Sequence, residues 1–162
     1  MIIGNRETIS FELSGFTGGL LNVNFYLGNR LVTDEPAHAP TYSYSFQKNL
    51  ARLRIGDFKN QRLNGLTPIQ LVRTIETERN SNEPQFFKHL LQIDETIDQF
   101  QIYLLETNGL TSFTWYNSNE RAFNSEEDYN KIYSTELSTS ELTSTLERLN
   151  SELEKELANT GL

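Results

Sequence analysis

The chain has 162 residues, of which 36% are hydrophobic and 22% charged, and its formal net charge is −8 at pH 7. This composition predicts a globular chain that is long enough to bury a core, and it argues against intrinsic disorder. The absence of cysteine excludes disulfides, thiolate metal sites and a cysteine nucleophile.

The N-terminus and the apolar stretches bear on where the protein resides. No apolar stretch is long enough for a transmembrane helix, and residues 1–7 have neither the basic nor the apolar region of a signal peptide. We therefore expect a cytoplasmic protein that forms a single domain over residues 1–162.

Alternation of apolar and polar residues predicts β-strands in the first third of the chain. A first strand has apolar residues at every second position over 9–13, and a second covers 20–27 after a glycine-rich break at 15–19. Gly28-Asn29 predicts a tight turn into a further strand over 30–33.

The next segment is less regular. Residues 34–40 contain two prolines and predict a loop. Tyr42 and Phe46 then belong to an alternating pattern typical of a strand, whereas apolar residues from Phe46 to Leu53 recur as on one helix face. We predict a short strand followed by a helix over 46–55.

Two helix starts carry a capping box, in which a hydroxyl residue is followed three positions later by Gln or Glu. The boxes occupy 67–70, where proline stands at the first helical position, and 138–141. They predict helices over 67–79 and 139–158.

The second of these helices carries a single stripe of leucines at helical spacing. The stripe comprises Leu142, Leu146, Leu149, Leu153 and Leu157. A lone apolar stripe with charged flanks predicts a seam that docks against another surface.

The clearest local prediction is a hairpin over 98–117. Asn108-Gly109 is a strong two-residue turn signal, because both turn residues must tolerate positive φ. The resulting register pairs Thr107 with Leu110. On one face it gathers an apolar set, Phe100, Ile102, Leu104, Phe113 and Trp115. The other face is predicted to be half exposed, with Gln101, Tyr103, Leu105, Ser112, Thr114 and Tyr116.

The two histidines do not indicate a metal or catalytic site. Glu35 and His38 have the spacing of helical metal ligands, but they lie among prolines in a loop, so an exposed loop histidine is expected. His89 is interpreted as a partly buried structural residue. Neither histidine has a second one nearby to complete a usual zinc set, and no cofactor is expected.

Other catalytic patterns are equally incomplete. Residues 15–19 superficially resemble a phosphate-binding loop but lack its Gly-Lys-Ser/Thr ending. No serine lies in a Gly-x-Ser-x-Gly elbow. Glu126, Glu127 and Asp128 are candidate paired carboxylates for a glycosidase, but adjacent acids in a polar stretch are typical of a solvated surface.

Charge is distributed unevenly along the chain. Residues 94–162 hold 14 acidic and 4 basic residues, a balance of −10, whereas residues 1–93 hold 8 acidic and 10 basic residues, a balance of +2. Negative potential attracts basic proteins and opposes nucleic acid. A basic cluster lies in the first half: Lys48, Arg52, Arg54, Lys59 and Arg62. We expect it to pair with the acidic half, within the chain or across a dimer.

Acidic and aromatic residues concentrate between positions 115 and 136. Tyr and Trp are favoured interface anchors, and surrounding carboxylates would steer a basic partner. The candidate partner-binding residues are Trp115, Tyr116, Glu120, Glu126, Glu127, Asp128, Tyr129, Tyr133 and Glu136. The alternative is that the aromatic residues belong to the core and the acids to ordinary surface.

Three elements together resemble small immunity proteins of bacterial polymorphic-toxin and contact-dependent growth inhibition systems. They are the opening Met-Ile-Ile-Gly with its alternating strand, the strand from Asn22 to Gly28, and the strand over 97–104 with its hairpin partner through Trp115. The resemblance covers residues 1–117, and the loop at 34–40 and the C-terminal helix have no place in it. It implies a non-enzymatic α+β protein that binds one cognate toxin domain, in many cases a nuclease.

The expected fold is therefore α+β, with one antiparallel sheet covered on one face by helices and a long C-terminal helix. The expected function is neutralisation of a cognate, basic toxin domain, without nucleic acid or membrane as a partner and with the oligomeric state open. The alternatives are an adaptor that docks a partner through the C-terminal helix and a small hydrolase.

Overall fold

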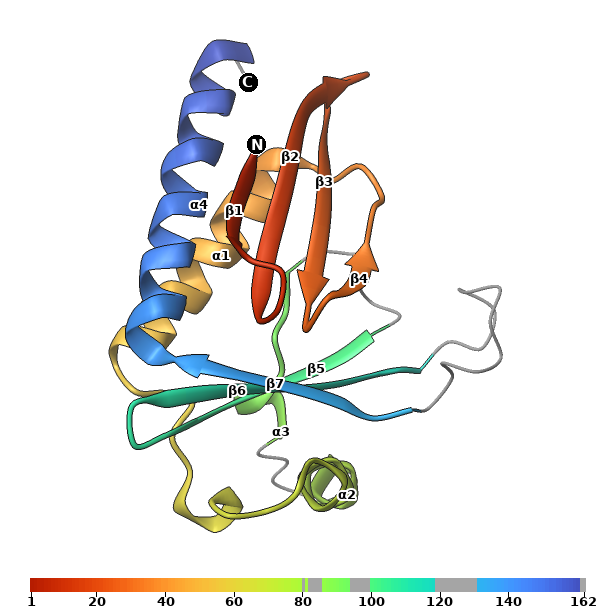
Figure 1. The fold of residues 1–162 in the computed structure, drawn as a ribbon, viewed down its shortest axis with the longest axis vertical. Helices are drawn as coiled ribbons and strands as arrows, with labels where there is room; N and C mark the ends of the chain where they lie inside the picture. The colour runs from red at the N-terminus through yellow and green to blue at the C-terminus, as the bar shows by residue number, and fades with distance from the viewer. Residues whose placement is uncertain (80, 82–85, 94–99, 119–130, 161–162) are drawn as a thin grey trace.

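A computed structural model describes residues 1–79, 81, 86–93, 100–118 and 131–160. Within these ranges seven strands form two antiparallel sheets, which four α-helices and one short 3-10 helix accompany (Figure 1). The α+β class and the long C-terminal helix are thus confirmed. The strands do not join into one sheet, as the sequence interpretation had them, but form two.

The N-terminal sheet is a meander of four neighbouring strands. These are β1 (Ile2–Asn5), β2 (Ile9–Thr17), β3 (Leu20–Leu27) and β4 (Arg30–Thr33). Gly28 and Asn29 have φ of 53° and 64°, which confirms the predicted tight turn. The predicted break at 15–19 is too long, because β2 continues to Thr17 across a register shift between Leu13 and Phe16.

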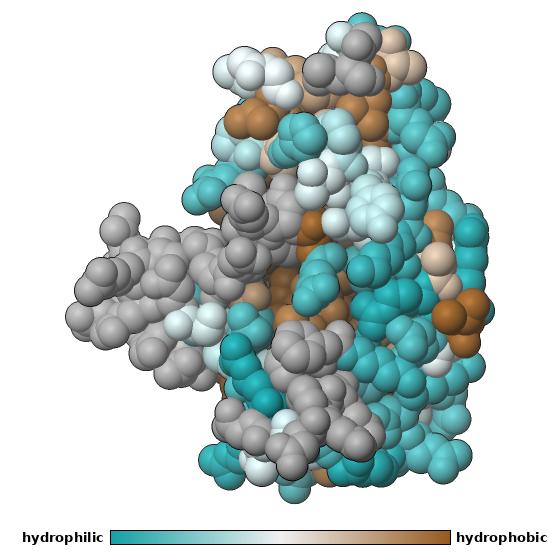
Figure 2. Space-filling model, turned by 180° about the vertical axis from the view of Figure 1, so that it is seen from behind, coloured by the Kyte–Doolittle hydropathy of each residue, from teal (hydrophilic) through white to brown (hydrophobic). Residues whose placement is uncertain are grey.

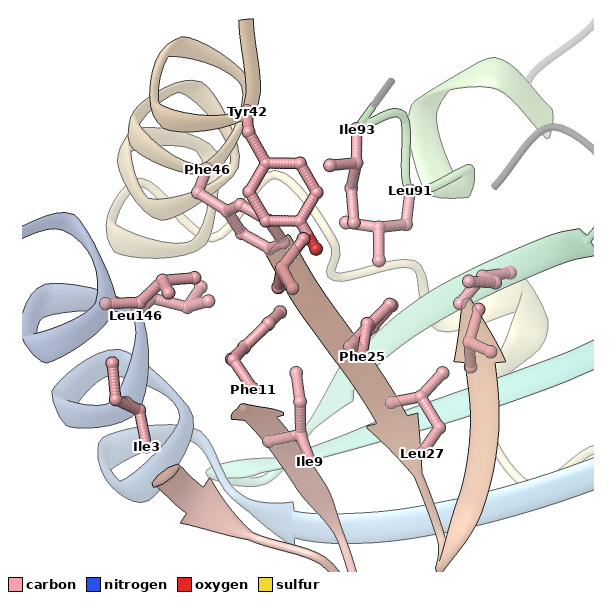
Figure 3. Packing of buried hydrophobic residues seen from close by; sticks show 14 of the residues in the cluster. Ile3, Ile9, Phe11, Phe25, Leu27, Tyr42, Phe46, Leu91, Ile93 and Leu146 are labelled. Atoms are coloured by element: carbon pink, nitrogen blue, oxygen red, sulfur yellow. The ribbon is translucent and has the colours of Figure 1, made fainter. Parts of the chain in front are cut away.

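Two helices cover the apolar face of the N-terminal sheet. They are α1 (Ala39–Arg54) and α4 (Thr139–Thr160), which also pack against each other. Figure 3 shows Phe46 of α1 and Leu146 of α4 directed towards Phe11 of β2. The Phe11 ring stacks on Phe25 with centroids 4.8 Å apart and meets Phe46 edge-on at 5.0 Å, a geometry that adds to the free energy of burial.

The predicted strand at the start of the 42–56 segment is wrong, because α1 begins at Ala39, seven residues before the predicted start of the helix. Pro40 lies in the first turn, where its missing N–H costs nothing. Tyr42 and Phe46 are buried on one face, one helical turn apart, whereas Tyr44 is 68% exposed. The alternation of aromatic residues is therefore incidental, and the helical spacing decides the structure.

The C-terminal sheet has three strands in the order β5 (Phe100–Thr107), β6 (Leu110–Asn117) and β7 (Tyr133–Ser138). The hairpin prediction is confirmed, since Thr107 pairs with Leu110 and the register holds along both strands. Asn108 and Gly109 have φ of 51° and 79°. The predicted apolar face of this hairpin contributes to the same core as the N-terminal sheet.

The opposite face of the C-terminal sheet is also covered in part, which the sequence interpretation did not foresee. Helix α2 (Pro68–Arg79) lies on that side, away from the N-terminal sheet (Figure 1). Its apolar residues form a second, smaller cluster with Tyr103 and Leu105. Helices therefore lie on both sides of this sheet, and not on one face as predicted. The short helices η1 (Gln61–Leu63) and α3 (Phe86–His89) precede and follow α2.

A side-chain cap forms at both predicted helix starts, and at the first of them both hydrogen bonds of the capping box are present. The Thr67 and Gln70 side chains each accept a backbone N–H from the other residue, at 3.3 and 3.0 Å. At the start of α4, the Ser138 hydroxyl accepts the N–H of Glu141 at 3.1 Å. Local side-chain chemistry thus fixes where both helices begin.

The leucine stripe of α4 belongs to the core. Leu142, Leu146, Leu149 and Leu153 are buried, and Leu157 packs partly buried against the same cluster. The other side of the helix carries charged residues, and the surface on the α4 side is mainly hydrophilic when the molecule is seen from behind (Figure 2). The stripe docks within the chain, so its leucines are not available to a partner helix.

Candidate functional site

Four residues of the predicted partner site lie in the described part of the chain, and these four do not share one surface. Trp115 is 2% exposed and lies in the main core, where its ring contacts Tyr133 with centroids 5.9 Å apart. Tyr133 is half-buried, and the guanidinium of Arg30 lies 3.8 Å from its ring centroid. These two aromatic residues hold strand β7 against the N-terminal sheet.

Two further predicted residues lie on the other face of the C-terminal sheet. Tyr116 is half-buried beside α2, and Glu136 is exposed on β7. The remaining predicted residues, Glu120, Glu126, Glu127, Asp128 and Tyr129, fall outside the described part of the chain.

A carboxylate between α2 and the C-terminal sheet accepts two tyrosine hydroxyls. Tyr116 donates to Oε1 of Glu76 at 2.9 Å, and Tyr103 donates to the same oxygen. The Arg79 guanidinium lies 3.6 Å from Oε2. A charged acceptor strengthens such hydrogen bonds, so Glu76 fastens α2 to the sheet.

This arrangement raises the pKa of both tyrosines. Burial, followed by the hydrogen bond to Glu76, raises the pKa of Tyr103 well above its ordinary value of 10.0. The same two causes raise the pKa of Tyr116 to about 12. Both groups therefore stay protonated and remain donors at any physiological pH.

Sequence reasoning missed this cluster, although a signal was present. Glu76 stands one helical turn after Val72 and next to Ile75, both of which face the sheet. An acid on the apolar stripe of a helix predicts a buried partner with a hydrogen to donate.

A groove of about 390 Å³ opens beside this cluster, between the start of α2 and strands β6 and β7. We call it the α2–β7 groove, and its lining residues are Leu66, Pro68, Leu71, Leu105, Ser112, Thr114, Ser134, Thr135 and Glu136. Residues of β5 and β6 (Tyr103, Leu105 and Tyr116) pack in the α2 cluster, whereas Ser134 and Glu136 of β7 are exposed beside it. Among the described residues that line the groove, Glu136 alone is charged.

His89 is a structural residue, as predicted. It is buried, its Nδ1–H donates to the Leu104 carbonyl at 2.9 Å, and Nε2 accepts from the Asn60 side chain at 3.3 Å. Burial is the main cause that lowers its pKa below 6.5. A neutral imidazole thus ties α3 to β5.

His38 is exposed immediately before α1, and its Nδ1 lies 2.8 Å from the Thr41 hydroxyl. In the described ranges no three His, Cys, Asp or Glu side chains are grouped so that they could hold a metal ion. Nor does any helix of these ranges have the length and apolar character needed to cross a membrane.

Four of the five residues in the basic cluster of the first half form ion pairs within the chain. Arg54 contacts Glu147 of α4 at 2.5 Å, and Lys59 lies 3.5 Å from Glu106 of β5, so two of its members reach the acidic half as predicted. Arg52 instead contacts Asp57, and Arg62 contacts Glu78. Much of the positive charge of the first half is therefore matched locally.

Two antiparallel sheets, closed by a long C-terminal helix and flanked by a small α2 layer, define the α+β class to which this fold belongs. A solved structure shares it: CdiI from Burkholderia dolosa, a contact-dependent inhibition immunity protein, which has a TM-score of 0.65 and 16% identity to this chain. The match covers 94% of this chain and 99% of that one, which is more than the first 117 residues alone can supply.

At this identity the likeness concerns the fold. It agrees with the resemblance to immunity proteins that the N-terminal strands and the hairpin indicate. No protein-family model matches the sequence, and no curated protein matches it.

Proposed function

We propose that this protein is a non-enzymatic immunity protein, which binds and neutralises one cognate toxin domain of a contact-dependent inhibition or related polymorphic-toxin system. The observation that carries the proposal is the fold shared with CdiI over nearly the full length of both chains. The strands that suggested the family from sequence alone support it independently. We further propose that it acts in the cytoplasm, without nucleic acid or membrane as a partner.

The partner is proposed to be basic, in keeping with a nuclease domain. Residues 94–162 carry a balance of −10, and acidic surfaces steer basic partners to fast association. Among the predicted site residues, the exposed carboxylate of Glu136 offers such a charge. The acidic residues of 119–130 remain part of this proposal.

Co-expression with the toxin domain encoded by the adjacent reading frame tests the proposal. We expect the two proteins to copurify and the host cells to survive toxin expression. A toxin of a different sequence type from the same kind of system is the control, and it should remain lethal. Death of the cells with the cognate toxin, together with no copurification, would contradict the proposed function.

A further inference from the structure

The α2–β7 groove holds a carboxylate that the fold does not use. Glu136 is exposed, and it makes neither an ion pair nor a side-chain hydrogen bond with the residues that the structure describes. The two acids of α2 differ in this respect: Glu76 accepts two tyrosine hydroxyls, and Glu78 pairs with Arg62. Among the residues that the structure describes, nothing therefore compensates the charge at the groove.

From this we infer that the groove receives an extended segment of the toxin domain and that a lysine or arginine side chain of this segment pairs with Glu136. The inference rests on the proposed function and deepens it, because it selects one surface and one kind of contact. It narrows the predicted site from an acidic and aromatic segment to a groove with one carboxylate.

The lining of the groove suits both the apolar stem and the charged head of a lysine or arginine side chain. Leu66, Pro68 and Leu71 form an apolar wall against which a methylene stem can pack. Ser134 lines the groove beside Glu136 and is exposed, so its hydroxyl can accept a further N–H donor of the charged head. A volume of about 390 Å³ leaves room for such a side chain and part of its backbone.

The position of β7 makes the groove accessible to an extended chain. β7 is the outermost strand of its sheet, and within the described ranges it pairs with β6 alone. Its edge lies beside the groove, since Ser134 and Glu136 belong to both. A partner segment can therefore run along β7 and place a side chain into the groove from that side.

The wall opposite β7 is held in place before any partner binds. Glu76 fixes α2 through Tyr103 and Tyr116, and the capping box at Thr67 fixes its first turn, which supplies Pro68 and Leu71 to the lining. A preformed wall lowers the entropy cost of binding.

The test measures the affinity of purified variants for a catalytically inactivated form of the adjacent toxin domain, by calorimetry at low and moderate salt. We expect Glu136→Lys to weaken binding by about tenfold or more, because it replaces an attraction with a repulsion. Glu136→Gln should weaken it less and reduce its salt dependence. Ser134→Trp, which fills the groove without changing charge, should also weaken it.

Glu35→Gln is the matched control, since it removes the same charge from an exposed position just after β4, in the N-terminal half of the chain. It should leave the affinity unchanged, and thermal unfolding of every variant should show that the fold is retained.

The outcomes separate the two proposals. If the wild-type protein does not bind the toxin domain, both are overturned. If the wild-type protein binds but Glu136→Lys binds equally tightly, the toxin uses another surface, and the groove inference alone is overturned. The same holds if Glu35→Gln weakens binding as much as Glu136→Gln does.

Discussion

The two faces of the C-terminal sheet are stabilised in different ways. Residues on the face towards the N-terminal sheet belong to one large apolar cluster, together with residues of β2, β3, α1 and α4. The face towards α2 enters a much smaller cluster and relies in addition on the Glu76 carboxylate and its two tyrosines. Apolar burial is the dominant source of stability, so the large cluster determines the free energy of global unfolding. The smaller α2 layer can open separately, at a lower free energy.

The largest expected effect comes from the main core. Phe11→Ala removes a fully buried ring that contacts Phe25 and Phe46, and should lower the free energy of unfolding by about 3–5 kcal/mol. Urea denaturation followed by circular dichroism measures this loss. Tyr44→Ala, on the exposed side of α1, is the control and should change it by less than about 0.5 kcal/mol.

The next effect should be local to the α2 layer. Glu76→Gln replaces a charged acceptor by a neutral one for both tyrosines. It should lower the free energy of opening the α2 layer by about 1–2 kcal/mol. Amide hydrogen exchange should then speed up in α2 and not in α4. Glu78→Gln, on the same helix, removes only a surface pair with Arg62 and should have little effect. Equal acceleration in α4 would show that the two layers open together.

Only part of the difference between the two faces of the C-terminal sheet could be predicted from the sequence. The hairpin turn at Asn108-Gly109 and both capping boxes were predicted because they act within a few residues. The choice between one sheet and two depends on which strand edges meet, and apolar alternation is the same in either case. Strand β7 was missed for a related reason: only Tyr133, Thr135 and Leu137 mark its inner face, in a segment dominated by its charges.

The site was less predictable than the fold. Composition drew attention to residues 115–136, but strand alternation turns Trp115 and Tyr133 towards the core and Glu136 away from it. The α2–β7 groove forms between elements more than 60 residues apart in the sequence, from 66–71 and 134–136. No local pattern encodes such a surface.

A third effect is confined to alkaline solution and also reports on the α2 layer. Because the folded-state pKa values of Tyr103 and Tyr116 lie above 10.0, the stability that these groups contribute is complete below pH 10. It is lost as the pH rises towards about 12, the pKa of Tyr116. Absorbance at about 295 nm should show late-titrating tyrosines that Tyr103→Phe and Tyr116→Phe remove. Titration of all tyrosines near pH 10 in the folded protein would contradict this prediction.

The smallest effect concerns His89, which is buried between α3 and β5. The folded-state pKa of His89 is lowered below 6.5. Its contribution to the free energy of unfolding is therefore complete above pH 6.5. The contribution is lost as the pH falls further, because the unfolded chain then binds a proton that the folded chain does not. Thermal unfolding between about pH 7 and pH 5.5 should show this decline. His89→Leu should flatten it, and His38→Gln should not.

Helix α4 also determines the order in which the fold can be completed during synthesis. Strands β1–β4 pair with their neighbours in sequence and can form early. The leucines that cover their apolar face, from Leu142 onwards, leave the ribosome after every other described element. Until then Phe11 and Phe46 lack part of their cover, and such surfaces bind chaperones or aggregate. A chain truncated before residue 139 is therefore expected to be insoluble, and not a smaller folded protein.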